Sequence, residues 1–183
     1  MTKKTTTKDT DQAHAHPMNT PRIEKITVNI GVGEPGERLQ KAQSVLENIT
    51  NQSPVQTLSK KTNKDFGTRK RMPLGCKVTL RGQRADTFLK KALDTRENKL
   101  ADYSIDDQGN FSFGIPDHTL FKDQKYNPDI GIFGMDVCVT MGKPGYRVKH
   151  RRIQRRKIRR AVQLARNETK QFITQQFGVE VIE

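Results

Sequence analysis

The chain has 183 residues, and its 34 Lys or Arg against 20 Asp or Glu give a formal net charge of +14. Hydrophobic residues make up only 32% of it, so we expect one domain with a thin core and much surface that faces water or a charged partner. No apolar run approaches the ~18 residues that span a bilayer, which argues against a membrane partner, and the positive surplus indicates a polyanionic one.

Residues 1–17 are mostly Thr, Lys, Asp, Gln and His without periodicity. Such a segment cannot bury enough apolar surface to offset the entropy of ordering, so we predict a disordered tail that lacks the apolar stretch of a secretory signal. Cys76 and Cys138 stand alone in their segments. They form no paired-cysteine zinc motif, and the expected compartment is a reducing cytosol.

A single domain is predicted over residues 18–183. Apolar residues alternate at Ile26, Val28 and Ile30, which predicts a strand with Thr27 and Asn29 on its other face. In 36–50 the apolar residues recur at three- and four-residue steps, which predicts an amphipathic helix. A short strand is expected at 55–58.

The segment 60–75 is predicted to be a long exposed loop, because it has neither helical nor strand periodicity. Six of its first twelve residues are basic and one is acidic, and Phe66 is its one aromatic residue. A strand follows at 76–81, with Lys77, Thr79 and Arg81 on its polar face. A helix is expected at 85–94 with Asp86 as its N-cap, and 94–109 is expected to be irregular.

Two more strands are predicted at 111–115 and 134–141 from their alternating apolar residues. An Arg-rich arm, residues 143–160, follows with ten Lys or Arg and no acid. We then expect a helix with Asn167 as its N-cap and Gly178 as its stop, and a final edge strand near the C-terminus.

These elements indicate an α+β fold. Each strand has one apolar and one polar face, which is typical of antiparallel pairing. The amphipathic helices can cover the apolar face, so we expect a mainly antiparallel five-stranded sheet with helices packed on one side.

A glycine pattern, Gly31-x-Gly33-x-x-Gly36, stands between a predicted strand and a helix, where a dinucleotide site would lie. Glu34 would put a negative charge where the pyrophosphate must sit, and Pro35 removes a backbone donor. The acid expected about 20 residues further on is absent. A plain turn into the helix is therefore the favoured interpretation.

Two histidines, His14 and His16, could bind a metal, but no third ligand accompanies them in the tail, so no metal site is predicted. Neither paired carboxylates nor a nucleophile with a matching base stand out, so we expect no enzyme and no cofactor.

The basic segments are predicted to bind phosphate groups, because uncompensated charge of one sign disfavours a compact chain unless a partner neutralises it. Since the cations are spread over a loop, a strand and an arm, they suit an irregular folded RNA better than a regular DNA groove. The loop cations are Lys60, Lys61, Lys64, Arg69, Lys70 and Arg71, and the arm cations are Arg147, Arg151, Arg152, Arg155, Arg156, Arg159 and Arg160.

Five segments in order, PRIEKITVNIGVGE, PVQTLSKKT, RMPLGCKVTLRG, QGNFSFGI and GIFGMDVCVTMGKPGYRV, resemble the ribosomal protein L5 family of the large subunit. The resemblance runs from about Pro21 to the C-terminus and is of the archaeal and eukaryotic type, and the basic surface points to an archaeon that is not halophilic. It implies a five-stranded antiparallel sheet and a ribosomal location, in the central protuberance.

The resemblance also implies a binding site for 5S rRNA. The family residues that touch this RNA match Asn29, Gln52 and Thr79, and the flanking cations Lys77 and Arg81 belong to the same expected site. The family usually has Gly-Gln-Lys-Pro where this chain has residues 51–54, Asn-Gln-Ser-Pro. That departure replaces the glycine of the turn and removes one charge.

Further partners follow from the resemblance. The loop 60–73 would face the P-site tRNA, the arm would contact large-subunit rRNA, and the protein would touch neighbouring 5S-associated proteins and a small-subunit protein across a bridge. Two other functions stay open at this point: a nucleotide-using enzyme built on the glycine turn, and a general nucleic-acid compactor.

Overall fold

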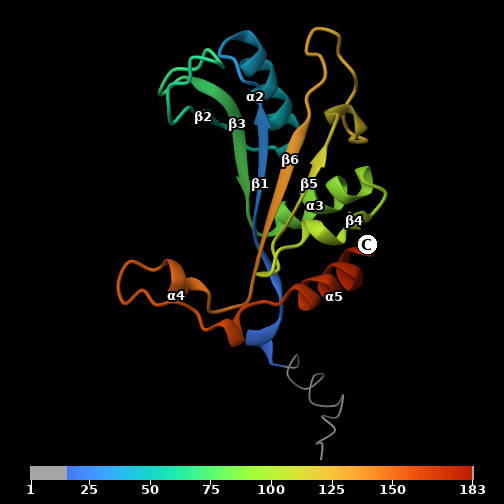
Figure 1. Ribbon diagram of the computed structural model, residues 1–183. Helices are drawn as coiled ribbons and strands as arrows, with labels where there is room; N and C mark the ends of the chain where they lie inside the picture. The colour runs from blue at the N-terminus through green and yellow to red at the C-terminus, as the bar shows by residue number, and fades with distance from the viewer. Residues whose placement is uncertain (1–15, 183) are drawn as a thin grey trace, which may run out of the picture.

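The computed structural model describes residues 16–182 (Figure 1). Residues 1–15, which include His14 and most of the predicted tail, lie outside the described part. The centre is a five-stranded antiparallel sheet in the order β2-β3-β1-β6-β5, which confirms the predicted α+β fold. Its strands are β1 (Arg22–Gly31), β2 (Val55–Leu58), β3 (Pro73–Leu80), β5 (Phe111–Ile115) and β6 (Met135–Gly142).

Helices cover one face of this sheet. The helix α2 (Glu37–Thr50) packs on β3, and α3 (Gln83–Thr95) packs on β1. The alternating residues of the covered face, among them Ile26, Val78 and Val137, are buried, as are Leu46 and Leu89 of the helices. Burial of this apolar surface holds the layers together. The opposite sheet face carries the polar residues of the same strands, as their alternation predicts.

The C-terminal part lies at the end of the sheet where β1 begins and β6 ends (Figure 1). The chain leaves β6 into the arm, which holds α4 (Arg147–His150), passes through η4 (Arg160–Val162) and then forms α5 (Arg166–Phe177). The short 3-10 turns η1 (Pro17–Asn19), η2 (Asp102–Ser104) and η3 (His118–Leu120) complete the elements together with the short strands β4 (Lys99–Ala101) and β7 (Glu180–Ile182).

The predicted final strand is confirmed, but a strand within a segment expected to be irregular was missed. Residues 94–109 contain the strand β4 (Lys99–Ala101), and β7 (Glu180–Ile182) pairs with it in parallel, in a second two-stranded sheet apart from the main one. Strands of three residues are too short to show a period, and their pairing depends on where α5 returns the chain.

Three element boundaries also differ from the sequence interpretation. The N-cap of α3 is Gly82, with Asp86 in the first turn, and the N-cap of α5 is Ala165 rather than Asn167. The strand β3 begins at Pro73, three residues before the predicted start. Gly75 lies within it, where a Cβ would be 2.5 Å from the Ile30 carbonyl oxygen, so the glycine that obscured the alternation permits close pairing with β1.

Within residues 16–182, the helices include none with the length and apolar character needed to cross a membrane, and no cluster of three potential metal ligands occurs.

Candidate nucleic-acid interface

The open face of the sheet presents two rows of mainly polar side chains across its strands. Strand pairing places Val55 opposite Lys77, Lys77 opposite Asn29, and Asn29 opposite Asp136. A second row joins Thr79, Thr27, Cys138 and Ser112 in the same way. Because residues in register share a face, Asn29, Lys77 and Thr79 form one continuous surface, as predicted.

Charge is distributed unequally over this face. Lys77 on β3 and Asp136 on β6 are both exposed, and they flank the half-buried Asn29 from opposite sides. A polyanion that settles on the face meets a cation toward β2 and a carboxylate toward β5. The half formed by β2, β3 and β1 is therefore the half that favours phosphate groups.

Gln52 reaches the same half of the sheet from the turn between α2 and β2. Its Nε2 donates a hydrogen bond to the Thr79 carbonyl oxygen at 3.3 Å. In the β2–β3 register, position 53 would stand opposite Thr79, but β2 begins only at Val55, so the Gln52 amide takes the place of a strand partner at this carbonyl. The structure thereby brings Gln52 and Thr79 into direct contact.

The turn before Gln52 keeps its shape without a glycine. Asn51 ends α2 in the left-handed region, with φ 50° and ψ 35°, and its N–H donates to the Glu47 carbonyl oxygen. Asn is the residue other than Gly that adopts this conformation most readily. The departure from the usual family pattern therefore leaves the placement of Gln52 intact.

Arg81 does not continue the polar row. It lies beyond the end of β3, exposed, and its Nη1 donates to the Glu24 carbonyl oxygen at 3.5 Å. Four residues of strand separate it from Lys77, a distance of about 13 Å. The structure thus places Arg81 just beyond the end of the strand, two residues after Thr79 and at the edge of the predicted 5S rRNA site.

The basic loop extends the β2–β3 ladder as an ordered hairpin. Ser59 N donates to the Met72 carbonyl oxygen and Arg71 N to that of Ser59, and Asn63 forms a bridge with Thr68. Phe66 stands near the tip and is 79% exposed. All six predicted loop cations are exposed: Lys60, Lys61, Lys64, Arg69, Lys70 and Arg71.

The arm carries most of its arginines into solvent. Arg151 is half-buried and donates from Nε to the Gln154 carbonyl oxygen at 2.9 Å. In the described part of the chain, the other six arm arginines make no ion pair; these exposed residues are Arg147, Arg152, Arg155, Arg156, Arg159 and Arg160. Free guanidinium groups in this number are suited to forked contacts with phosphates.

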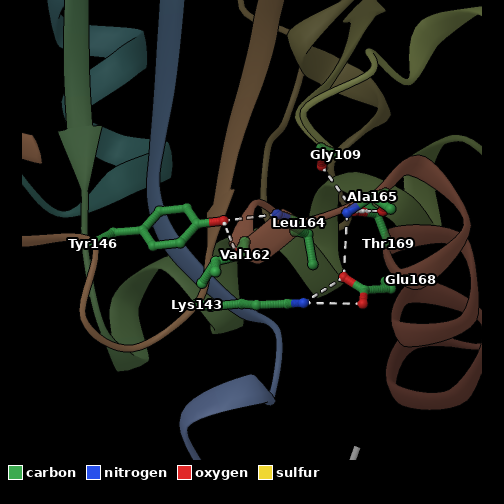
Figure 2. A network of polar contacts seen from close by, with 8 residues as sticks. All are labelled: Gly109, Lys143, Tyr146, Val162, Leu164, Ala165, Glu168 and Thr169. Carbon is green, nitrogen blue, oxygen red and sulfur yellow. Dashed lines mark hydrogen bonds and ion pairs between the residues drawn. The ribbon is translucent and has the colours of Figure 1, made fainter. Parts of the chain in front are cut away.

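Lys143, which the sequence counts with the arm, serves a different purpose. Its side chain is 8% exposed and its Nζ lies 2.7 Å from Glu168 Oε2 on α5. Glu168 Oε2 also accepts the Ala165 N–H at 3.2 Å (Figure 2). This cation anchors the arm and is not available to RNA.

Tyr146 closes the base of the arm (Figure 2). Its hydroxyl accepts the Leu164 N–H at 2.7 Å and donates to the Val162 carbonyl oxygen at 3.4 Å. Burial raises the pKa of this phenol, and the Glu168 carboxylate raises it further while the Leu164 N–H lowers it. The hydroxyl therefore joins the outgoing and returning ends of the arm and stays protonated at neutral pH.

The loop and the arm extend from opposite ends of the sheet (Figure 1). The loop follows β2 beside the end of β1, whereas the arm follows β6 beside its beginning. The ten residues of β1 span about 33 Å between them. Either one RNA covers the length of the sheet and meets both extensions, or two RNA segments each meet one of them.

The alternative nucleotide site at the glycine turn finds no support in the geometry. Val32 N and Gly33 N both donate to the Leu74 carbonyl oxygen, so these groups are not free to bind a phosphate. The strands on either side of α2 are also antiparallel to their neighbours, unlike a dinucleotide unit. The His16 Nδ1 accepts the Met18 N–H within its own turn at 3.2 Å.

Three features that shape the interface could not be predicted from sequence patterns. They are the hydrogen bond of Gln52 to the Thr79 backbone, the ion pair of Lys143 with Glu168 and the hydrogen bond of Tyr146 with Leu164. Each joins residues that are distant along the chain. The sequence gives one indication that Lys143 is buried: it comes directly after a strand, where a side chain can still be covered by the core.

Comparison with known proteins gives a consistent match over most of the chain. Residues 16–69 match the family described as Ribosomal protein L5, and residues 73–180 match the model for the C-terminus of the same ribosomal family. The large ribosomal subunit protein uL5 of Methanococcus aeolicus is 50% identical over 168 residues, 90% of this chain and 93% of that protein. Its counterpart in Methanobrevibacter smithii is 47% identical over 167 residues, 91% of this chain and 98% of that protein.

These relatives are archaeal, in agreement with the resemblance read from the five sequence segments. The two family matches together cover both the sheet and the arm. The chain therefore belongs to the ribosomal protein L5 family, and it is a structural, rRNA-binding protein of the large subunit of the cytoplasmic ribosome and not an enzyme.

Proposed function

We propose that this protein binds 5S rRNA with the open face of its sheet and helps to attach that RNA in the central protuberance of the large subunit. The observation that carries the proposal is the uncovered polar face, flanked at its two ends by cationic extensions. Asn29, Lys77 and Thr79 lie on that face in register, and Gln52 adjoins them. Lys77 makes the β2 and β3 side of the face positive and Asp136 makes the β5 side negative, so we expect the RNA to lie over the β2 and β3 side.

The two extensions are assigned to other RNA segments. The loop 60–73 would face the P-site tRNA, with Phe66 at its tip offering a ring on which a base can stack. The arm would neutralise phosphates of the large-subunit rRNA. Because about 33 Å of sheet separates them, variants in one extension should leave binding by the other unchanged.

Protein partners complete the proposal. The protein would contact neighbouring 5S-associated proteins of the large subunit and a small-subunit protein across the bridge between subunits. These contacts rest on the family resemblance, and we assign no residues to them.

A competition experiment tests the main claim. Labelled 5S rRNA is bound by the purified full chain and displaced with unlabelled 5S rRNA, tRNA or duplex DNA. We expect 5S rRNA to compete at least tenfold better than either alternative. Equal competition by duplex DNA would identify a general nucleic-acid compactor instead.

The salt dependence tests the role of phosphates. Affinity should fall about tenfold or more between about 50 and about 200 mM salt, because two released counterions already produce that change. An affinity that hardly varies over this range would contradict a phosphate-led mechanism.

Point variants test the placement of the RNA on the sheet. Thr79→Val removes the hydroxyl at nearly constant shape and should cost about 1–3 kcal/mol of binding if that hydroxyl meets the RNA. Lys77→Gln should also weaken binding and reduce its salt dependence. Ser112→Ala on β5, exposed on the same face, is the matched control and should bind normally.

The loop is tested separately. Replacing Arg69, Lys70 and Arg71 by Gln should leave 5S rRNA affinity within about twofold, since general screening of remote charge is weak at physiological salt. A large loss of 5S rRNA binding would show that the loop contacts that RNA rather than tRNA.

A further inference from the structure

A cleft of about 830 Å³ opens where β1 begins and β6 ends. Four parts of the chain form it: the first residues of β1, the turn between β3 and α3, the stretch from the end of β6 to the arm, and α5. The lining residues used in the argument are Arg22, Lys25, Arg81, Tyr146, Arg147 and Phe172. This cleft lies at the other end of β1 from the basic loop.

The cleft is positively charged. Arg22, Arg81 and Arg147 are exposed, and Lys25 is half-buried. Within the described chain none of these four cations makes an ion pair. Arg81 has one side-chain hydrogen bond, to the backbone carbonyl oxygen of Glu24. A cleft lined by three guanidinium groups attracts a phosphate more strongly than any of them alone.

The lining also contains two carboxylates, Glu24 and Asp86. Glu24 faces His150, with 3.8 Å between Oε1 and Nε2. Lys143 is occupied by Glu168, and Asp86 is an exposed residue of the first turn of α3. Four cations, the three arginines and Lys25, therefore face two carboxylates, Glu24 and Asp86, and the lining stays positively charged.

Backbone irregularity shapes the wall. The β1–β6 register shifts between Ile23 and Lys25, so Glu24 is an extra residue on β1. The Glu24 carboxylate lies close to Gly142, where an added Cβ would be 3.6 Å from Oε2. A bulge of this kind redirects a side chain and ends regular pairing, and here it places Glu24 beside the arm.

The lining also includes aromatic surface. Tyr146 and Phe172 are both half-buried and come from the arm base and α5. The hydroxyl bonds of Tyr146 to Leu164 and Val162 hold the phenol in place (Figure 2). A fixed ring next to free guanidinium groups is the combination that binds an unstacked base with its phosphate.

We propose that this cleft receives one unpaired nucleotide of a bound RNA. Its phosphate would lie against Arg22, Arg81 and Arg147, and its base against Tyr146 and Phe172. The inference rests on the proposed RNA-binding function and adds a second site to the sheet face. A cube of this volume has edges of about 9 Å, which is narrower than a whole double helix, so a duplex does not enter.

The test uses the full chain and a single-stranded oligouridylate that carries 5-iodouridine, with an RNA duplex of equal length as comparison. The cleft variant is Arg81→Gln with Arg147→Gln. The matched control is Lys90→Gln with Lys125→Gln, which removes the same charge at exposed positions outside the cleft. Thermal unfolding verifies that both remain folded.

For the cleft variant, we expect the slope of log affinity against log salt to become about 1.4 units shallower, since each lost contact to a single strand contributes about 0.7. Affinity for the oligouridylate should fall at least tenfold, with the control variant within twofold of wild type. Photocrosslinking of the wild type should attach the iodouridine to Tyr146 or Phe172. Equal effects of the two double variants, or crosslinks confined to residues 60–71, would overturn the proposal.

The same variants separate this inference from the proposed function. If 5S rRNA binds the wild type and Lys77→Gln weakens it while the cleft and control variants behave alike toward both RNAs, the sheet-face function stands and the cleft proposal fails. If the cleft variant alone loses the oligouridylate while 5S rRNA shows no preference over duplex DNA, the cleft stands and the 5S assignment fails.

Discussion

Replacing Lys143 by Met is expected to lower the free energy of unfolding by about 2–3 kcal/mol. The Lys143 side chain is 8% exposed and pairs at 2.7 Å with Glu168, which is 24% exposed. Removing one partner of a fully buried pair costs about 3–5 kcal/mol, because the other charge stays buried without compensation. Water that reaches the more exposed Glu168 reduces that figure.

Thermal unfolding followed by circular dichroism measures the effect. For a protein of this size about 2–4 °C of Tm corresponds to each kcal/mol, so Lys143→Met should lower Tm by roughly 5–10 °C. Lys149→Met is the control, because it makes the same change at an exposed position of the arm and should cost less than about 0.5 kcal/mol.

A double variant makes the reasoning refutable. Lys143→Met with Glu168→Leu removes both charges, and it should be more stable than Lys143→Met alone, since the unpaired carboxylate is gone. The account of the arm base would be refuted if Lys143→Met and Lys149→Met lowered Tm equally. It would also be refuted if the stability loss of the double variant equalled the sum of the losses of Lys143→Met and Glu168→Leu.

Gly109→Ala should cost about 2–4 kcal/mol in urea unfolding, because φ is +75° there and a Cβ would overlap the side chains of Leu164 and Thr169. Gly178→Ala, in open space with φ +64°, should cost only about 1 kcal/mol, and equal costs would contradict the packing argument. A lysine hydrogen bond from α5 lowers the pKa of Asp102, so its contribution is complete above the unfolded pKa of about 3.9 and is lost as pH falls through the folded pKa. Asp102→Asn should therefore reduce Tm at pH 7, with the difference from wild type closing only below about pH 4; a constant difference down to pH 2 would count against this linkage. Iodoacetamide at pH 8 should modify exposed Cys138 and spare Cys76, whose pKa burial raises to about 11, and mass spectrometry showing equal rates would disprove it.

The main sheet was predictable because strand alternation is a local property. The buried residues Ile26, Val28 and Ile30 stand at the period that two sheet faces require, and the helix α2 shows its own period in the same local manner. The ends of the elements were less predictable. The start of β3 was missed because Gly75 interrupts the pattern at the point where it permits close pairing.

The candidate site divides in the same way. Asn29, Lys77 and Thr79 were correctly placed on the open face, since each alternates with buried neighbours on its own strand. Arg81 continues the sequence alternation, but the strand ends at Leu80 and the backbone turns away. A local period cannot foresee where the backbone leaves it.

By itself the sequence determined the α+β class, the polar face of the central strands and the two cationic segments, because spacing and charge are properties of neighbouring residues. Only the tertiary structure decided that Gln52 donates a hydrogen bond to the Thr79 backbone and that Lys143 pairs with Glu168. It also decided that one cleft is lined by Arg22, Arg81 and Arg147. These associations depend on the order in which strands pair and on where the chain returns. Composition and local period carry no information about such long-range contacts.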